Sequence, residues 1–369
     1  MPVALLGAAL LAAWQIEIQG ESIAYPTHSD ESIDVIAFGS CAREERDQPI
    51  WEHVLAAEPD LFLFIGDNMY ADIRPENGKE VMRPVTDAAE IAAAYQALAA
   101  QPNWQRLRRR CAVLATWDDH DYGANDMGND FPLRRESQQL FMDFYGVPAQ
   151  HPMRSQAGVY HAATFGPEDR RVQVILLDTR YHRDALDRKA VRDGLGPYAP
   201  TNDTGRTMLG EAQWAWLREQ LLQPARVRIV ASSVQVVAWE HGFETWGNMP
   251  HERERLYRLI DETGAGGVLF VSGDRHLMEI SVARGAGVPY PMWDFTSSGI
   301  NQGAGEVRDP NSFRVGPVER QPNFGIVRIQ WSSVAGNDRP TATAIHLEGY
   351  GANAQLLTRQ TVWLDELAK

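Results

Sequence analysis

Side chains that can bind a metal ion or move a proton follow four of the short apolar runs in this sequence. In an open α/β sheet, ligands bind beyond the carboxyl ends of the strands, so side chains placed there meet at one edge. A single aspartate after a strand is often only a helix cap or a turn residue. Four such ends in one chain favour a functional site over chance capping. They carry Cys41, Asp67, the run Asp118 to Asp121, and Asp274 with His276.

Residues 66–70, which read GDNMY, have the residue types of a metal site. A carboxylate offers two oxygens, so Asp67 can bridge two ions, and Tyr70 can return to the same point around a turn. A phenolate is a hard, charged ligand that suits trivalent iron better than zinc. The alternative is a turn with a packed tyrosine, which would be preferred if this segment stood alone.

Residues 117–121, which read WDDHD, place four titratable groups in a row directly after an apolar run. Such a density costs free energy unless cations neutralise it or water solvates it. A solvated loop is the alternative, which is weakened because a buried strand precedes the run. Asp274 and His276 are spaced by two, so in extended backbone they project to the same side. A structural histidine is the common alternative for that pair.

Six apolar runs predict strands that are buried on both faces, and helical patterns lie between them. The strands begin at Val35, Leu61, Ala112, Val172, Val227 and Val268, and the helices cover 90–110, 211–222 and 251–263. This alternation predicts an α/β architecture. In the C-terminal part, strands are predicted over 292–298, 324–331, 341–347 and 361–364, with a loop over 299–321. We expect these strands to form a second sheet that completes a sandwich within one composite domain.

Composition and charge exclude several classes of protein. Hydrophobic residues make up 44% and charged residues 23% of the chain, as in ordinary globular proteins. No apolar run reaches the roughly 18 residues of a membrane span. The 35 basic and 49 acidic side chains give a net charge of −14, so a protein that coats nucleic acid is not expected. An anionic substrate would need a locally positive group, such as a metal ion.

The sequence lacks the motifs of several competing chemistries. It has no G-x-S-x-G elbow, no P-loop, no G-x-G-x-x-G after the first strand, no H-E-x-x-H and no C-x-x-C. Its two cysteines, Cys41 and Cys111, can form at most one disulfide. Covalent serine chemistry and nucleotide-fold chemistry are therefore poorly supported.

The N-terminal residues 1–14 are apolar over a length that fits the core of a signal peptide. A preceding basic residue and a clear cleavage site are missing, so a buried segment is an equal alternative. We divide the chain into an N-terminal segment, 1–30, and one domain, 31–369. The apolar stretch favours a periplasmic or secreted protein, with a cytoplasmic one as the alternative.

Six motifs, taken together and in this order, resemble the PhoD-like (alkaline phosphatase D) branch of the calcineurin-type metallophosphoesterases. They are GSC at 39–41, GDNMYAD at 66–72, WDDHDYGANDMG at 117–128, LLDTRYHRD at 176–184, SSVQ at 232–235 and SGDRH at 272–276. The third motif is specific by itself, and the short ones are specific only in this order. The resemblance covers about residues 33–350. It implies a four-layer α/β/β/α sandwich with two mixed sheets.

The resemblance also implies a set of metal ligands. GDxxY is shared with purple acid phosphatases, which implies that Asp67 bridges two metals and that Tyr70 binds ferric iron. The usual D-x-H motif is absent, and PhoD-like proteins use a cysteine in that region. The second site is rich in oxygen ligands, which favour calcium, magnesium or manganese over zinc. The implied centre holds Fe³⁺ and Ca²⁺, with Mn²⁺, Mg²⁺ and Zn²⁺ as alternatives. Its iron-side ligands are Cys41, Tyr70 and His276, and its second-site ligands are Asp119 and Asp274.

The implied activity is hydrolysis of phosphate esters by a metal-activated hydroxide, as in alkaline phosphatases and phosphodiesterases. Asn68, Arg43 and His120 are the catalytic candidates, which would hold phosphate oxygens, and His120 could also assist the leaving group. A surface arginine is the alternative for Arg43. We expect a small phosphate ester as substrate, and the oligomeric state is left open. Two other functions stay open: a phospholipase-like phosphodiesterase for larger substrates, and a binding protein that keeps the metals without turnover.

Overall fold

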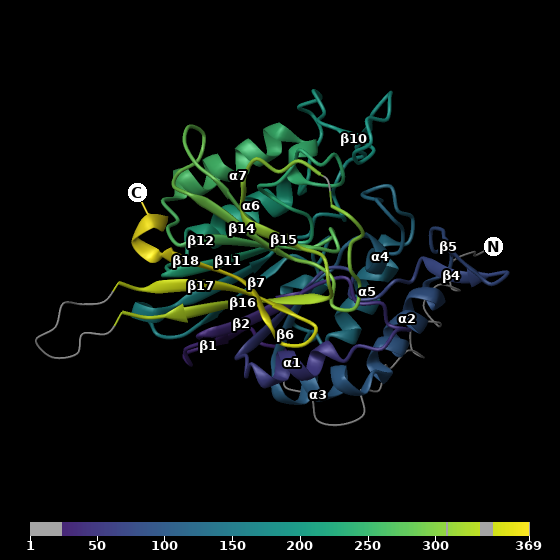
Figure 1. The fold of residues 1–369 in the computed structure, drawn as a ribbon, viewed down its shortest axis with the longest axis horizontal. Helices are drawn as coiled ribbons and strands as arrows, with labels where there is room; N and C mark the ends of the chain where they lie inside the picture. The colour runs from purple at the N-terminus through teal and green to yellow at the C-terminus, as the bar shows by residue number, and fades with distance from the viewer. Residues whose placement is uncertain (1–23, 308, 333–341, 369) are drawn as a thin grey trace, which may run out of the picture.

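Two mixed β-sheets stack face to face in this protein, in a computed structural model that describes residues 24–307, 309–332 and 342–368 (Figure 1). The six-stranded sheet has the order β18 (Leu356–Trp363), β17 (Ala344–Gly351), β16 (Asn323–Gln330), β2 (Val35–Gly39), β3 (Leu61–Ile65) and β6 (Ala112–Thr116). The eight-stranded sheet has the order β1 (His28–Ser29), β7 (His161–Phe165), β8 (Val172–Leu176), β11 (Val227–Ser232), β12 (Val268–Ser272), β14 (Met292–Ser297), β13 (Met278–Ala283) and β15 (Arg314–Glu319).

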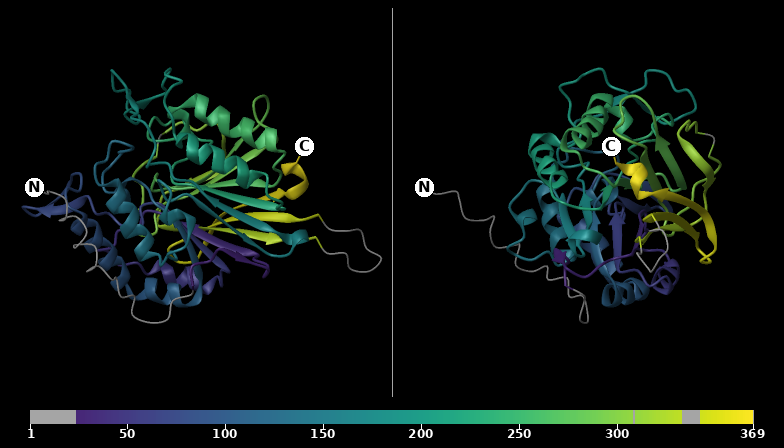
Figure 2. Two further views of the ribbon diagram at one scale, coloured as in Figure 1. Left: turned by 180° about the vertical axis from the view of Figure 1, so that it is seen from behind. Right: turned by 90° about the vertical axis from the view of Figure 1, so that its left-hand side faces the viewer.

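Helices cover the outer face of each sheet (Figures 1 and 2). The helices α1 (Ile50–Ala56), α2 (Ala88–Ala100), α3 (Pro102–Arg110) and α5 (Arg134–Phe144) pack on the six-stranded sheet, and α6 (Gly210–Leu221) and α7 (Pro250–Thr263) pack on the eight-stranded sheet. The predicted α/β/β/α sandwich with two mixed sheets is confirmed.

The alternation of side chains along β3 shows why its apolar run is continuous. Leu61, Leu63 and Ile65 belong to the core between the two sheets. Phe62 and Phe64 point the other way and pack against Trp51 of α1, with ring centroids 5.1 Å and 5.7 Å from it. Because successive side chains point to opposite faces, a strand that is covered on both faces needs apolar residues at every position.

One predicted helix is two helices in the structure. The pattern over 90–110 predicted a single helix, but α2 ends at Ala100 and α3 begins at Pro102. Gln101 between them is extended, with φ −65° and ψ 118°. A proline disfavours helical backbone in the residue before it and is itself favoured in the first turn of a helix.

The C-terminal strands do not form a sheet of their own, so the predicted division of the sandwich was wrong. β16 pairs antiparallel with β2 and extends the sheet of the N-terminal strands, whereas β14 pairs with β12 in the other sheet. The span 299–321, predicted as a loop, contains the strand β15. The glycine and proline of β15 are tolerated because it lies at the edge of its sheet.

The parallel strands bring their carboxyl ends to one end of the molecule. β2, β3 and β6 are parallel in one sheet, and β8, β11, β12 and β14 are parallel in the other. The short helix α4 (Asp119–Tyr122) lies at this end, flanked by the hairpins β4 (Ile73–Glu76)–β5 (Lys79–Met82) and β9 (Asp187–Arg188)–β10 (Tyr198–Ala199) (Figures 1 and 2). Among the described residues, no helix combines the length and apolar character of a membrane span. The apolar stretch 1–14 lies outside the described residues.

Candidate metal centre

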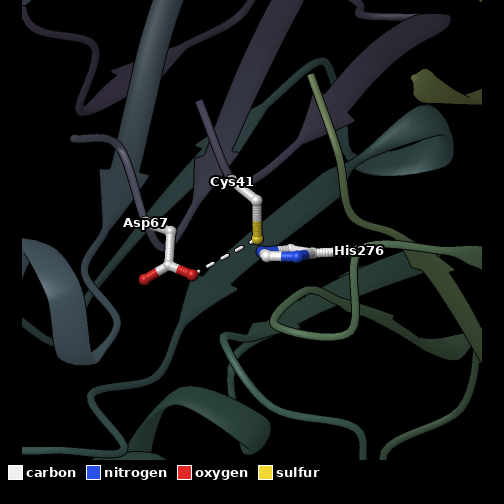
Figure 3. A group of neighbouring side chains, drawn as sticks. All are labelled: Cys41, Asp67 and His276. Atoms are coloured by element: carbon white, nitrogen blue, oxygen red, sulfur yellow. Dashed lines mark hydrogen bonds between the residues drawn. The ribbon is translucent and has the colours of Figure 1, made fainter. Parts of the chain in front are cut away.

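Three strand ends supply the first group of candidate ligands. Cys41 follows β2, Asp67 follows β3 and His276 follows β12, and one ligand atom of each lies within 4.8 Å of the others. The Cys41 thiol lies 3.3 Å from Oδ2 of Asp67 (Figure 3). Burial raises the pKa of this thiol to about 11, so a cation is needed to hold it as a thiolate near neutral pH. The structure thus brings together three of the predicted ligands.

Tyr70 returns to the same point around the turn that follows β3. Its hydroxyl donates to Oδ2 of Asp67 at 3.2 Å and lies 3.1 Å from Nε2 of His276. Burial raises the pKa of the Tyr70 phenol well above its ordinary value, and the neighbouring Asp67 adds to this. The phenol therefore lies where the sequence predicted a fourth ligand, beside the group of Cys41, Asp67 and His276.

A second group shares Asp67 with the first. Ligand atoms of Asp67, Asp119 and His120 lie within 4.8 Å of one another. The two oxygens of Asp67 divide between the groups, because Oδ2 lies near the thiol and Oδ1 accepts a long hydrogen bond of 3.4 Å from the backbone N–H of His120. His120 was predicted beside the metals as a catalytic residue, and the structure places it close enough to be a ligand.

The strand ends that carry the ligands contain several residues with left-handed backbone. The φ angles are 60° at Cys41, 48° at Asp67, 69° at Asp274 and 54° at His276. Each such non-glycine residue costs on the order of 1–3 kcal/mol, and such residues cluster at functional sites. Asp274 and His276 were predicted to share a side of extended backbone, and this prediction was wrong because neither residue is extended. Asp274 belongs to none of the three groups of ligand atoms found among the described residues.

His120 is oriented by Asp72, which was not among the predicted site residues. Nδ1 of His120 lies 2.7 Å from Oδ1 of Asp72, and the other oxygen of Asp72 accepts the backbone N–H of Asn125 at 2.9 Å. Asp72 is fully buried. The His120 ring also packs on Tyr70, with ring centroids 4.2 Å apart. The final aspartate of the GDNMYAD segment was visible in the sequence, but nothing in its spacing showed that it faces His120.

A third group of carboxylates extends the site beyond the predicted residues. Ligand atoms of Asp119, Asp126 and Glu244 lie within 4.8 Å of one another. Burial and the Glu244 charge raise the pKa of Asp126 to about 7. The hydroxyl of Tyr198, on the β9–β10 hairpin, donates to Asp126 at 2.5 Å. Asp126 lies within the third sequence motif, but Glu244 and Tyr198 follow no motif and could be placed only by the fold.

A buried network of ion pairs contacts these carboxylates. Nε of Arg180 donates to Asp118 at 2.6 Å, and its guanidinium also pairs with Glu244 at 2.5 Å. Arg183 reaches the other oxygen of Glu244 at 2.8 Å. The Ser233 hydroxyl donates to Asp118 at 2.6 Å. These two arginines pair directly with Asp118 and Glu244, whereas neither forms an ion pair with Asp67 or Asp119 among the described residues.

Two of the predicted catalytic residues are already engaged by protein groups. The amide nitrogen of Asn68 donates to the carbonyl of Thr116 at 3.0 Å and also to Asp121. Its side-chain oxygen is buried and accepts no hydrogen bond from the residues that the structure describes. The guanidinium of Arg43 lies over the ring of Tyr70, 5.4 Å from its centroid, and forms ion pairs with two glutamates. Arg43 is buried and is thus not the surface arginine of the alternative interpretation.

The charges of the site fit multivalent cations. Burial raises the pKa of Asp67 and Asp274 well above the ordinary value, and neighbouring acidic groups add to this. Burial would also raise the pKa of Asp119, but His120 and Arg180 hold it below its ordinary range. A thiol, a phenol, two imidazoles and several buried carboxylates form a donor set for metal ions, and the unpartnered oxygen of Asn68 adds one more acceptor.

Comparisons with known proteins match this chain to phosphatases. The family model of the PhoD-like phosphatases matches residues 36–331. Alkaline phosphatase D of Bacillus subtilis (strain 168) is 25% identical, over 65% of this chain and 45% of that protein, so the chain spans about half the length of this curated relative.

Solved structures share the fold. A structure of PhoD matches with a TM-score of 0.64 and 18% identity, over 92% of this chain and 74% of that one. GAP50, described as the anchor in the inner membrane complex of Plasmodium, matches with a TM-score of 0.56 and 11% identity, over 90% of each chain. Because the family model spans most of the chain and the predicted ligands converge, the chain belongs to the PhoD-like phosphatase family.

Proposed function

We propose that this protein hydrolyses phosphate esters at a metal-dependent centre built on Asp67. The observation that carries the proposal is that Asp67 belongs to two groups of ligand atoms, one with Cys41 and His276 and one with Asp119 and His120. A carboxylate shared in this way can hold two ions next to each other. Paired ions activate a water molecule and neutralise phosphoryl oxygens when they are bound.

The donor types support different metals on the two sides of Asp67. We assign Fe³⁺ to the side with the thiol, phenol and imidazole donors, because phenolate suits a trivalent ion. We assign Ca²⁺ to the oxygen-rich side, since calcium prefers oxygen ligands, with Mn²⁺, Mg²⁺ or Zn²⁺ as alternatives. The iron side comprises Cys41, Asp67, Tyr70 and His276, and the second side comprises Asp67 and Asp119. Asp274 is assigned to the second side from the sequence resemblance, since it lies outside these groups of ligand atoms.

His120 supplies the proton that the leaving group needs. Asp72 holds Nδ1 of His120, so Nε2 is the nitrogen left to face a substrate. Burial alone would lower the pKa of His120, but Asp119, Asp67 and Asp72 raise it well above its ordinary value. The protonated imidazole can donate to a phosphoryl oxygen or to the departing alkoxide.

Arg43 and Asn68 have different roles in this proposal. The guanidinium of Arg43 lies beside Tyr70 and carries a buried Nε–H that has no acceptor in the described part of the chain, so it can bind a phosphate oxygen. The amide nitrogen of Asn68 is occupied by Thr116 and Asp121, which leaves only its side-chain oxygen. We therefore assign Asn68 to holding a cation rather than a phosphate oxygen.

Turnover and absorption measured together test the proposal. The purified protein is assayed on a nitrophenyl phosphate monoester and the corresponding diester, with its metals determined by elemental analysis. We expect hydrolysis of at least one ester, a loss of at least 10²-fold in Asp67→Asn, and no change in the surface control Asp143→Asn. Iron bound by Tyr70 should give a visible absorption band that Tyr70→Phe removes or shifts. If the metal-loaded protein hydrolyses neither ester, its function would instead be that of a binding protein without turnover.

A further inference from the structure

Arg43 is held rigidly at its backbone while its side chain is only partly satisfied. Asn301 accepts the backbone N–H of Arg43 and donates to its carbonyl, both at 2.8 Å, and Gln48 donates to the same carbonyl at 3.0 Å. The Arg43 side chain is only 5% exposed. Its Nε–H nevertheless has no acceptor among the described residues. A buried guanidinium with an unused donor is prepared to bind a further anion.

One of the two carboxylates that pair with Arg43 comes from a projecting hairpin. Nη1 and Nη2 of Arg43 donate to the two oxygens of Glu80 at 3.4 Å and 3.2 Å, and Nη2 also pairs with Glu45. Glu80 lies on β5 of the β4–β5 hairpin, whose two strands pair only with each other and project beside α4 (Figure 1). Its side chain is 57% exposed. A movement of Glu80 away from Arg43 would also break its contact with Arg46, at 3.3 Å.

We propose that Glu80 is a specificity-determining residue that competes with anionic substrates for Arg43 and so weakens their binding. The proposal rests on the assignment of Arg43 to phosphate binding in the proposed function. Nη1 has Glu80 as its acceptor and Nη2 is shared between Glu80 and Glu45, so loss of the Glu80 charge frees Nη1 and leaves only Glu45 on the Nη1–Nη2 edge of the guanidinium. A carboxylate and a phosphate use the same forked geometry on arginine, so the two compete for that edge.

The expected change in anion affinity depends on how exposed the Arg43–Glu80 ion pair is to solvent. An ion pair with one exposed partner contributes little free energy, and its contribution decreases with added salt. Replacing Glu80 should therefore tighten anion binding by about two- to fivefold at low ionic strength. The maximal rate should change by less than about twofold, because Glu80 acts on binding and does not reach the reacting atoms.

Phosphate binding and steady-state kinetics of the metal-loaded protein test the proposal. We would measure the Kd of inorganic phosphate by calorimetry, and KM and kcat with the nitrophenyl ester that the enzyme hydrolyses best. Glu80→Gln should lower Kd and KM by about two- to fivefold, and the gain should shrink when salt is raised to about 0.5 M. Glu76→Gln is the matched control: Glu76 lies on the same hairpin and pairs with Arg83 at 3.0 Å, so the same change of charge should leave Kd and KM unchanged.

The double variant shows whether the effect passes through Arg43. In an Arg43→Gln background, Glu80→Gln should have no further effect on phosphate binding. The proposal is overturned if the two glutamate variants behave alike, if Glu80→Gln raises Kd, or if its effect persists without Arg43. Phosphate binding needs no turnover, so it can be measured in a protein that hydrolyses no ester. If Glu80→Gln tightens phosphate binding in such a protein, only the proposed function is contradicted and the role of Glu80 stands.

Discussion

At the scale of single residues, His120 contacts both aspartates that the groups of ligand atoms share. Its backbone N–H contacts Asp67 and Asp119, and its ring lies between Tyr70 and Asp72. The surrounding carboxylates raise the pKa of His120 well above its ordinary value, although burial alone would lower it. The same contacts would suit a metal ligand or a general acid, and the two roles differ in what their removal does.

We expect His120→Ala to slow the hydrolysis of alkyl phosphate esters by about 10² or more, the usual range of general acid catalysis. Nitrophenyl esters should lose much less, because their leaving group needs little protonation. The measurement is kcat/KM on both ester types together with the bound metal, and His53→Ala on α1 serves as the histidine control. Equal losses on both esters, or a variant that no longer holds metal, would identify His120 as a ligand instead.

The sequence allowed the residues within motifs to be found, but not their partners. Asp67 and Tyr70 could be assigned from the GDxxY segment because both lie on one tight turn, and the structure places them 3.2 Å apart. Glu244 reaches Asp119 and Asp126 from a loop far away in the sequence. No local spacing encodes such a contact, since it depends on how β11 and β6 are stacked in different sheets.

At the scale of elements, α4 is a single turn that tertiary contacts hold in place. Isolated helices of this length are not stable in water. The Asp118 N–H donates to Asp121 at 2.6 Å at the start of the turn, and Arg180 fixes the Asp118 side chain. Asp119 and His120 are thus positioned by a buried ion pair rather than by helix propensity.

Removing one partner of the Arg180–Asp118 ion pair should destabilise the folded protein. Breaking a buried ion pair leaves an uncompensated charge, so we expect Arg180→Gln to lower the free energy of unfolding by about 3–5 kcal/mol. The control is Arg218→Gln, whose ion pair with Glu262 is about half-exposed on both sides and should cost less than about 1 kcal/mol. Urea unfolding of both variants makes the comparison, and a similar small loss in each would show that Arg180 does not hold α4.

Elements were predictable where one local pattern was sufficient. The strands at Val35, Leu61 and Val268 follow from continuous apolar runs, and the end of α7 follows from Gly264, whose φ is 64°. The break at Gln101 was missed because a periodic apolar pattern continues through it, although Pro102 signals it. The pairing of β16 with β2 could not be predicted, because hydrogen bonds between strands that are far apart in the sequence do not change the hydrophobic periodicity of either strand.

At the scale of the whole molecule, the candidate metal centre joins the two sheets. Cys41 and Asp67 follow strands of the six-stranded sheet, whereas His276 follows a strand of the eight-stranded sheet. An ion bound by all three therefore contacts both layers of the sandwich. Because anything that binds the folded state alone adds to its stability, metal binding should stabilise the contact between the sheets and not only the loops that carry the ligands.

Metal removal should for this reason lower the stability of the entire domain. A ligand at about 100 times its Kd contributes about 2.7 kcal/mol, which corresponds to several degrees in Tm for a chain of this size. We expect a chelator to lower Tm by at least about 5 °C and to abolish activity, and calcium or manganese to restore part of both. His276→Ala removes the ligand from the eight-stranded sheet, so its Tm should already be low and should respond less to chelator. Scanning calorimetry of both proteins with and without chelator provides the measurement. An unchanged Tm and full activity in the chelated wild-type protein would contradict a metal centre that spans the sheets, because the buried carboxylates would then be stable without cations.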